Sequence, residues 1–410
     1  MSKMKKTIKF VWVFFLLIAI FFTFAVLSSW LPDTGIKKHI DKAAISMQKA
    51  GDYPNAIIDD TPCRQDNYTD ALILNLIYGI DRSTPIRSAM SNNMQGSSVT
   101  DLNETGTLLL ITQKDLSLYT FSYARYWHGT TFLGRFLLTF LSYSNLQWLL
   151  FATSVLLFVI FICLYYPRAG LWKTIALMLS WVLVNGFVTQ FSLQFFPVWA
   201  ITLIASILII RFNDKSQDLG ILMFIIGAVT CYFDLLTTPL LSLGWPLVVW
   251  LSLQDPRDVT LKQTLWQLIR WSLLWGLGFA LSFVTKWILG TLIIGTNVIK
   301  DALKEATTVV ASQDLTHWDA IAANLNMLSW NMVLIALIIV ALFTIWRFRY
   351  RGGMQAVLFL CIALIPFVWY FIVFSHSYLH FWFTYRLLAV SIAAILMAML
   401  SFTKERKLIS

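Results

Sequence analysis

The sequence predicts an all-α polytopic membrane protein with about ten transmembrane helices. Of the 410 residues, 58% are hydrophobic and only 13% are charged, whereas an ordinary soluble domain carries about 25% charged residues. Long apolar runs recur along the chain, and the segments between them differ systematically in charge. A small extracytoplasmic, α-rich domain is expected in the first outer loop, which is the longest segment between two apolar runs.

The first apolar run, from Phe10 to Leu31, follows the basic start Met-Ser-Lys-Met-Lys-Lys. It is longer than the apolar part of a signal peptide and lacks a small-x-small cleavage site, so we predict a retained membrane anchor. A hydrocarbon core of roughly 30 Å needs about 20 apolar helical residues. Further predicted spans lie near residues 145–166, 171–188, 194–211, 219–235, 237–253, 271–293, 328–346, 354–374 and 386–402.

These runs divide the chain into five parts. The first is an N-terminal tail with its helix (1–31), and the second is an outer loop domain with interfacial helices (32–144). Transmembrane helices two to seven follow (145–295), and then an outer amphipathic loop (296–327). The last part holds helices eight to ten and a cytoplasmic tail (328–410).

The distribution of charge predicts the orientation. With the N-terminus inside, the predicted cytoplasmic segments hold 17 Lys and Arg against 5 Asp and Glu, a net charge of +12. Segment 32–144 holds 10 cations and 11 acids, a net charge of −1. Cytoplasmic loops are enriched in Lys and Arg, so both termini of this multi-pass cell-membrane protein are expected in the cytoplasm. The positive charge therefore reflects the orientation of the chain in the membrane. The expected partners are membrane lipids and not nucleic acid.

The outer segment contains short predicted elements. A helix starts at Asn67, runs through the apolar residues 71–78 and stops at Gly79. Residues 88–107, rich in Ser, Asn and Gly, predict an irregular stretch, and residues 108–112 predict a short strand or buried segment. The second outer segment, 296–327, predicts an amphipathic helix.

An acidic cluster at residues 59–70 supplies the catalytic candidates Asp60, Asp66 and Asp70. A carboxylate at the outer membrane surface can act as a general base toward a hydroxyl group, or hold a divalent cation. Asp66 and Asp70 are four residues apart, so a helix places both on one face. The alternative is structural: Asp66 or Asn67 caps the helix, and Asp59-Asp60 forms a solvated turn.

Arg125 and His128 lie just before the chain returns to the membrane. The forked donors of an arginine suit a phosphate group, so these two residues are candidates for substrate binding. The alternative is an interfacial anchor, because Tyr126 and Trp127 between them are typical of membrane interfaces.

His376, His380 and Arg386 lie between the last two predicted spans. The two histidines are four residues apart and can share one helical face, but no nearby Glu completes a zinc-binding motif. Anion binding with Arg386 is therefore favoured over metal binding, with an aromatic girdle at the interface as the alternative. No organic cofactor or metal site is indicated, although the acidic cluster leaves a divalent metal open.

Asp234 and Lys286 lie inside apolar runs, where an ionisable residue is by default a functional candidate. Each follows a charged residue at the predicted cytoplasmic surface, Asp218 or Arg270, by 16 positions, which places both about 24 Å from that surface. We therefore predict that both face the bundle interior, and that they pair directly or share one anionic head group.

This layout resembles the C-type membrane glycosyltransferase superfamily: an anchor with its N-terminus inside, an acidic first outer loop with interfacial helices, and many further spans. The positions that match are Asp59-Asp60, or Asp66 followed by Tyr68. The sequence departs from the pattern because the acidic pair lies nearly thirty residues beyond the first span, not directly after it.

The resemblance implies transfer of a sugar from a polyprenyl-phosphate carrier to an envelope glycan or lipid, with a first-loop Asp as base. Arg125, His128, Lys286 or Arg386 would stabilise the phosphate left behind. Two other classes stay open: a lipid or glycan transporter or flippase that uses Asp234 and Lys286, and a non-catalytic envelope-assembly protein. No Gly-rich phosphate loop is present for a soluble nucleotide sugar.

Overall fold

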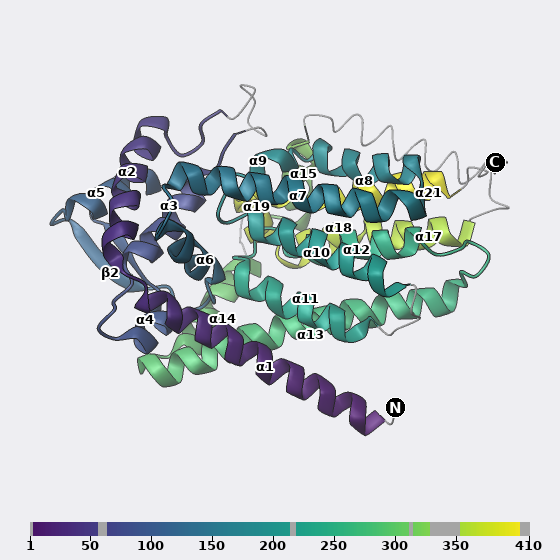
Figure 1. Cartoon of the computed structure of the whole chain (residues 1–410), viewed down its shortest axis with the longest axis horizontal. Helices are drawn as coiled ribbons and strands as arrows, with labels where there is room; N and C mark the ends of the chain where they lie inside the picture. Colours follow the sequence, from purple (N-terminus) through teal and green to yellow (C-terminus); the bar gives the residue numbers. More distant parts are fainter. Residues whose placement is uncertain (1–2, 56–63, 214–218, 311–314, 329–352, 402–410) are drawn as a thin grey trace.

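The computed structural model describes residues 3–55, 64–213, 219–310, 315–328 and 353–401. This part of the chain is mainly helical, with one two-stranded sheet. Two regions follow one another along the longest axis (Figure 1): short elements, α2 to α6 with the sheet, occupy one end, and long helices form the rest. We call them the cap region and the helical bundle. The start of α1 and the end of α21 lie at the end of the bundle away from the cap region.

Several helices suit a membrane, in agreement with an all-α membrane protein, whereas the number of ten spans stays a prediction. Five stretches are long and apolar enough to cross a bilayer: Thr7–Trp30, Tyr143–Ala169, Leu261–Ile294, Gly353–Ile372 and Phe381–Leu400. They correspond to α1 (Lys3–Trp30), α7 (Tyr143–Ala169), α13 (Leu261–Ile294), α17 with α18 (Gly353–Ala363 and Ile365–Ile372), and α20, η2 and α21 (Phe381–Thr384, Tyr385–Leu387 and Leu388–Leu400). All but the first residue of the span predicted at 328–346 lies outside the described residues.

Four more apolar helices follow: α8 (Leu171–Leu183), α10 (Phe196–Asn213), α11 (Gly220–Phe233) and α12 (Leu241–Ser252). All except α10 are shorter than the spans predicted there. Helices of 12–14 residues, such as α8, α11 and α12, are only about 18–21 Å long, less than a hydrocarbon core. Further segments continue the chain from these short helices: α9 (Gly186–Thr189) and the non-helical segments 190–195 and 234–240. Both segments are mostly buried in protein, the condition under which irregular backbone is tolerated at membrane depth.

Helices α11 and α13 touch through glycines. A Cβ built on Gly227 would lie 2.0 Å from the carbonyl oxygen of Trp275, and one on Gly278 would lie 2.1 Å from that of Phe224. Any side chain at either position would push the helices apart, and such small residues allow close packing in membranes. This contact fixes the close spacing of α11 and α13.

The cap region comprises α2 (Asp33–Ala50), α3 (Asn67–Tyr78), α4 (Pro85–Ser91), β1 (Asn93–Ser97), α5 (Glu104–Gln113), β2 (Leu118–Ser122) and α6 (Gly129–Leu138). The helix predicted from Asn67 to Gly79 is confirmed as α3. The strand predicted at 108–112 is wrong, because these residues belong to α5. The Asn103 side chain caps α5 by accepting a hydrogen bond from the Gly106 N–H, and the buried Leu108 and Ile111 share one helical face.

Strand β1 falls in the stretch 88–107 that was predicted to be irregular, and no element was predicted at β2. They pair antiparallel, with Met94 opposite Phe121 and Gly96 opposite Tyr119. The second outer segment also differs from the single helix predicted for 296–327: it forms α14 (Val298–Val310) and α15 (His317–Asn326). A capping box between Thr316 and Asp319 starts α15, which explains why a new helix begins there.

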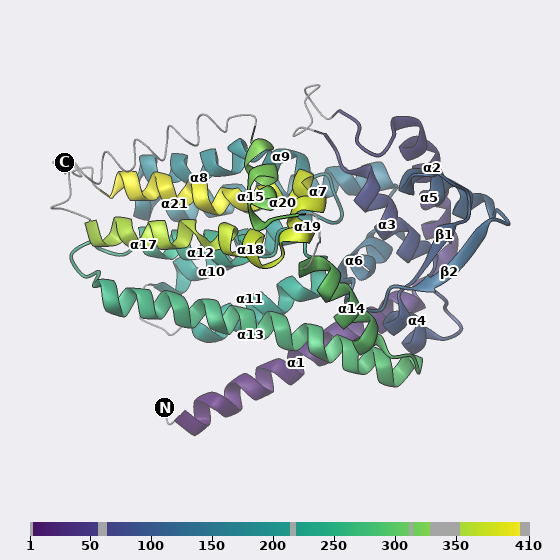
Figure 2. The same ribbon diagram turned by 180° about the vertical axis from the view of Figure 1, so that it is seen from behind.

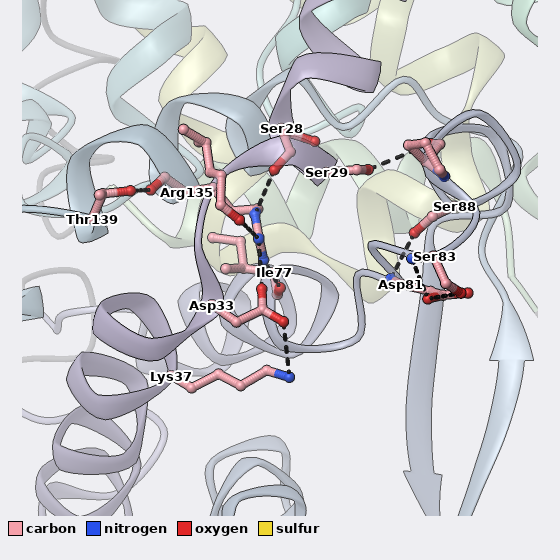
Figure 3. A network of polar contacts seen from close by, with 12 residues as sticks. Ser28, Ser29, Asp33, Lys37, Ile77, Asp81, Ser83, Ser88, Arg135 and Thr139 are labelled. Atoms are coloured by element: carbon pink, nitrogen blue, oxygen red, sulfur yellow. Dashed lines mark hydrogen bonds and ion pairs between the residues drawn. The ribbon is translucent and has the colours of Figure 1, made fainter.

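Arg135 on α6 fastens the cap region to α1 (Figure 3). Its fully buried guanidinium donates hydrogen bonds to the carbonyl oxygens of Ser28 (2.7 Å), Ile77 (3.0 Å) and Leu31 (2.9 Å), and to the Asp33 carboxylate (2.7 Å). These groups lie at the end of α1, the end of α3 and the start of α2. One side chain therefore satisfies carbonyls that two helix ends leave free, and it sets the angle at which the chain enters the cap region.

Candidate functional site

Three segments far apart in the sequence meet where the cap region joins the bundle. They are the start of α3, segment 190–195 before α10, and the stretch from α19 (Phe374–Leu379) to η2, which lies between α3 and α21 in Figure 2. Phe195 packs on Phe383 with ring centroids 5.6 Å apart, and Tyr53 contacts Trp382 at 6.1 Å. We call this meeting point the junction site.

Asp70 on α3 holds segment 190–195 in place. Its fully buried carboxylate accepts hydrogen bonds from the hydroxyls of Tyr143 (2.6 Å) and Ser192 (2.7 Å) and from the N–H groups of Leu193 (3.1 Å) and Gln194 (3.3 Å). A carboxylate with four donors is well satisfied. This geometry favours a positioning role for Asp70 over the predicted role of a general base.

Asp66 caps α3, as the structural alternative predicted. One of its oxygens accepts a hydrogen bond from the Thr69 N–H (2.8 Å) and the other from the Thr69 hydroxyl (2.8 Å). Burial raises the pKa of Asp66 to about 6, against the hydrogen bonds from Thr69 and the positive charge of Arg386. Each oxygen retains a free lone pair, so capping does not exclude a role as base. Asp60, the third predicted acid, lies outside the described residues.

Arg386 supplies the positive charge of the junction site. Its side chain is 5% exposed, and its guanidinium lies over the rings of Phe195 (5.5 Å) and Tyr385 (5.0 Å). Nη1 donates one long hydrogen bond, 3.3 Å, to the carbonyl oxygen of Trp382, whereas Nε is buried without a partner. A buried guanidinium with an unused donor is suited to receive an anion.

Other buried polar atoms of the junction site also lack partners. They are the Gln194 amide nitrogen and oxygen, Ser377 Oγ, His380 Nδ1 and Trp382 Nε1. Native structures rarely leave such groups unpaired unless water or a ligand satisfies them. Gln194 is fully buried beside the aromatic Phe195 on which Arg386 rests. The junction site therefore contains several buried donors and acceptors without partners.

The predicted proximity of His376 and His380 is confirmed. The rings of His376 and His380 lie 4.6 Å apart, and His376 Nε2 lies 3.0 Å from the Leu236 carbonyl oxygen. Burial, together with the neighbouring His380, lowers the pKa of His376 to about 4, so this ring is neutral at pH 7. Among the described residues, no group of three or more His, Cys, Asp or Glu side chains is placed to bind a metal.

Arg125 lies away from the junction site and already has carboxylate partners. It forms ion pairs with Asp301 (3.2 Å) and Glu305 (3.6 Å) on α14. Its neighbour His128 is buried, with Nε2 3.0 Å from the Tyr123 carbonyl oxygen, and burial lowers the pKa of His128 to about 3.

Arg125 borders an apolar cavity of about 310 Å³. Its walls come from α13, α14 and α18, and include Phe283, Trp287 and Trp369. Leu236 also lines this cavity, and the Leu236 carbonyl is the group beside His376. The apolar cavity therefore adjoins the junction site through segment 234–240.

Asp234 and Lys286 are both fully buried, as predicted, but they do not pair. Asp234 accepts hydrogen bonds from the hydroxyl and the N–H of Thr237, whereas Lys286 donates to the Met90 carbonyl oxygen (2.8 Å) and lies over the Trp127 ring (5.7 Å). The prediction of a pair from equal depth failed because α11 ends just before Asp234. The Asp234 side chain therefore bonds to Thr237, in the segment that follows the helix. Lys286 instead points across to α4. A shared head group stays a prediction.

Sequence reasoning missed Gln194, Trp382, Tyr53 and Arg135. Gln194 offered a signal, being a polar residue inside an apolar run. Trp382 stood in a motif already singled out for its histidines. Comparison of the chain with protein-family models, with curated proteins and with solved structures finds no match.

Proposed function

We propose that this protein is an integral membrane glycosyltransferase that takes a sugar from a polyprenyl-phosphate carrier and acts on the extracytoplasmic face. The observation that carries the proposal is that Arg386 lies close enough to Asp66 to act on its charge. The two residues come from opposite ends of the chain, and Arg386 rests on Phe195, next to the segment that Asp70 of α3 holds. An acid with a raised pKa and a buried cation with an unused donor, both at the junction site, supply the two charges that glycosyl transfer requires.

In the proposed reaction, the acceptor hydroxyl attacks the anomeric carbon of the donor sugar. Asp66 removes the hydroxyl proton as the new C–O bond forms, and the bond from the anomeric carbon to the phosphate oxygen breaks. The electron pair of that bond leaves with the lipid phosphate, whose added charge Arg386 stabilises. Asp70 positions the site by holding α3 against segment 190–195.

The apolar cavity supports a lipid-linked donor. Its walls are almost wholly apolar, and they include residues of α13 and α18, which the sequence assigns to the membrane. Leu236 lines this cavity, and its carbonyl oxygen lies against His376 of the histidine pair. An isoprenoid chain in the cavity would place its phosphate near the junction site. A soluble donor has no apolar chain, so the cavity would add nothing to its affinity.

The test is donor turnover by the purified protein in liposomes, with a panel of polyprenyl-phosphate hexoses and a bacterial envelope lipid extract as acceptor. Asp66→Asn should reduce turnover by about 10²–10⁴-fold, because Asn cannot take the proton. Asn still caps a helix, so folding should survive. The matched control is Asp115→Asn, an exposed acid that accepts a similar local hydrogen bond from the Ser117 N–H. Full activity of Asp66→Asn, or no turnover of any donor, would contradict the proposal.

The proposed orientation places the cap region outside the cytoplasm, following the charge distribution along the chain. Reporter fusions after Gly51 should be active outside, and fusions after Arg351 inside the cell. A cap region found in the cytoplasm would contradict an extracytoplasmic reaction.

A further inference from the structure

A row of aromatic side chains leads from the junction site to the surface of the cap region. Tyr53 and Tyr68 stack with ring centroids 6.1 Å apart at 12°, and Trp382 meets Tyr53 edge to face at 6.1 Å. The row continues to His380, whose ring lies 5.1 Å from Trp382. Tyr53 is 36% exposed although it belongs to this packed row, so part of its surface is open to solvent.

Carboxylates surround the two tyrosines. Asp66, Asp52 and Glu104 all act on the hydroxyl of Tyr53 and on that of Tyr68. Burial, followed by the negative charges of Glu104 and Asp52, raises the pKa of Tyr68 to about 12, so this hydroxyl remains a donor at every physiological pH. Asp52 already accepts hydrogen bonds from the N–H and the hydroxyl of Thr105. Glu104, at the start of α5, is only partly exposed.

Two members of the row carry unpaired nitrogen atoms. Trp382 Nε1 and His380 Nδ1 are both buried without a partner. The row therefore offers three things together: flat aromatic surface, carboxylate acceptors, and unpaired nitrogen atoms. A pyranose ring matches this set, because its faces carry C–H groups that pack on aromatic rings and its rim carries hydroxyls that both donate and accept.

We propose that Tyr53, Tyr68 and Trp382 form the acceptor subsite, and that it takes an uncharged hexopyranose. This inference rests on the proposed function, since it names the substrate class of the same site. The sugar is the acceptor because Asp66, the group that would receive the acceptor proton, acts on both tyrosines, whereas none of these three residues lines the apolar cavity. An uncharged sugar fits because an anionic one would meet Asp52, Asp66 and Glu104.

The binding test uses saturation-transfer NMR on the full chain in detergent. The probes are methyl β-D-glucopyranoside, methyl β-D-galactopyranoside and N-acetylglucosamine, with methyl β-D-glucuronide as the charged counterpart. At least one uncharged probe should receive saturation on its ring C–H protons, and the glucuronide should not. Tyr53→Ala should weaken binding by about threefold to tenfold, the usual value of one aromatic contact.

Three variants separate lost contact from lost folding. Tyr53→Phe keeps the ring and should retain binding, whereas Trp382→Phe keeps a ring but removes Nε1 and should weaken it. Tyr119→Ala, an exposed tyrosine on β2, is the matched control and should bind normally. Saturation of no probe, or equal saturation in Tyr53→Ala and the unaltered chain, would overturn the subsite.

The two proposals fail separately. Sugar binding that Tyr53→Ala reduces and Asp66→Asn preserves would support the subsite even if no donor is turned over. Conversely, donor turnover that is sensitive to Asp66→Asn, with an acceptor KM unchanged in Tyr53→Ala, would overturn the subsite and leave the transferase standing.

Discussion

Two buried arginines, Arg135 in the cap region and Arg386 in the bundle, have opposite surroundings. The Arg135 guanidinium donates to three carbonyl oxygens and a carboxylate, which come from α1, α3 and the start of α2. Arg386 makes one long hydrogen bond and leaves Nε unpaired. Burial alone therefore does not mark a functional residue. The two residues differ in whether the guanidinium donors have hydrogen-bond partners. Paired donors indicate a structural role, and an unused donor indicates a place for a ligand.

The largest expected effect on folding comes from Arg135→Gln. Removing one partner of a buried charged network costs about 3–5 kcal/mol, because Asp33 and three carbonyls lose their donor together. We expect a strongly lowered melting temperature in detergent, or loss of the protein from the membrane. Arg82→Gln, an exposed arginine of the cap region, is the control and should be neutral. Normal stability of Arg135→Gln would remove the distinction between the two arginines.

Arg386→Gln should produce the reverse pattern. Loss of one preorganised charge-stabilising donor lowers kcat by about 10²–10³-fold, while the melting temperature should change little because few bonds are lost. Arg386→Lys keeps the charge without the fork and should recover part of the activity. Arg257→Gln, 88% exposed, serves as the control. A stability loss as large as that of Arg135→Gln would identify Arg386 as structural.

The two acids of α3 allow the same comparison at a smaller scale. Asp70→Asn replaces an acceptor of four hydrogen bonds by a group with an N–H₂ that faces donors, so the free energy of unfolding should fall by about 1–3 kcal/mol. Activity should fall as a consequence, since segment 190–195 loses its anchor. Asp66→Asn should lose activity without this instability. Thermal unfolding and turnover of both variants distinguish the positioning role of Asp70 from the role of Asp66 as base. Equal stability of the two variants would contradict this assignment.

The smallest effect is on pH dependence. Burial raises the pKa of Asp66 to about 6, so the folded chain holds this proton more tightly than the unfolded chain, in which an Asp titrates near 3.8. The contribution of Asp66 to stability should therefore decrease as pH rises from about 4 to 6. Turnover should increase through pH 6, because the base must be ionised. Both trends should vanish in Asp66→Asn, and a pH–rate profile flat between pH 5 and 7 would contradict this assignment.

The sequence by itself determined the membrane class and the helix at α3. Apolar run length and low charge follow from the cost of exposing polar backbone to lipid, and this constraint acts locally along the chain. The start and stop of α3 were likewise readable, because capping depends on neighbouring residues such as Asp66, Thr69 and Gly79. The proximity of His376 and His380 could also be predicted, because they are only four residues apart.

Only the tertiary structure decided which of these residues have partners. Asp66 and Asp70 are equivalent in the sequence, yet Asp70 meets segment 190–195 more than 120 positions away and becomes saturated. Asp234 and Lys286 matched in depth, but the early end of α11 and the reach of Lys286 to α4 kept them apart. The contact of Tyr53 with Trp382 joins the two ends of the chain. Such distances in sequence leave no local pattern, because the partners are selected by how the helices pack and not by their neighbours.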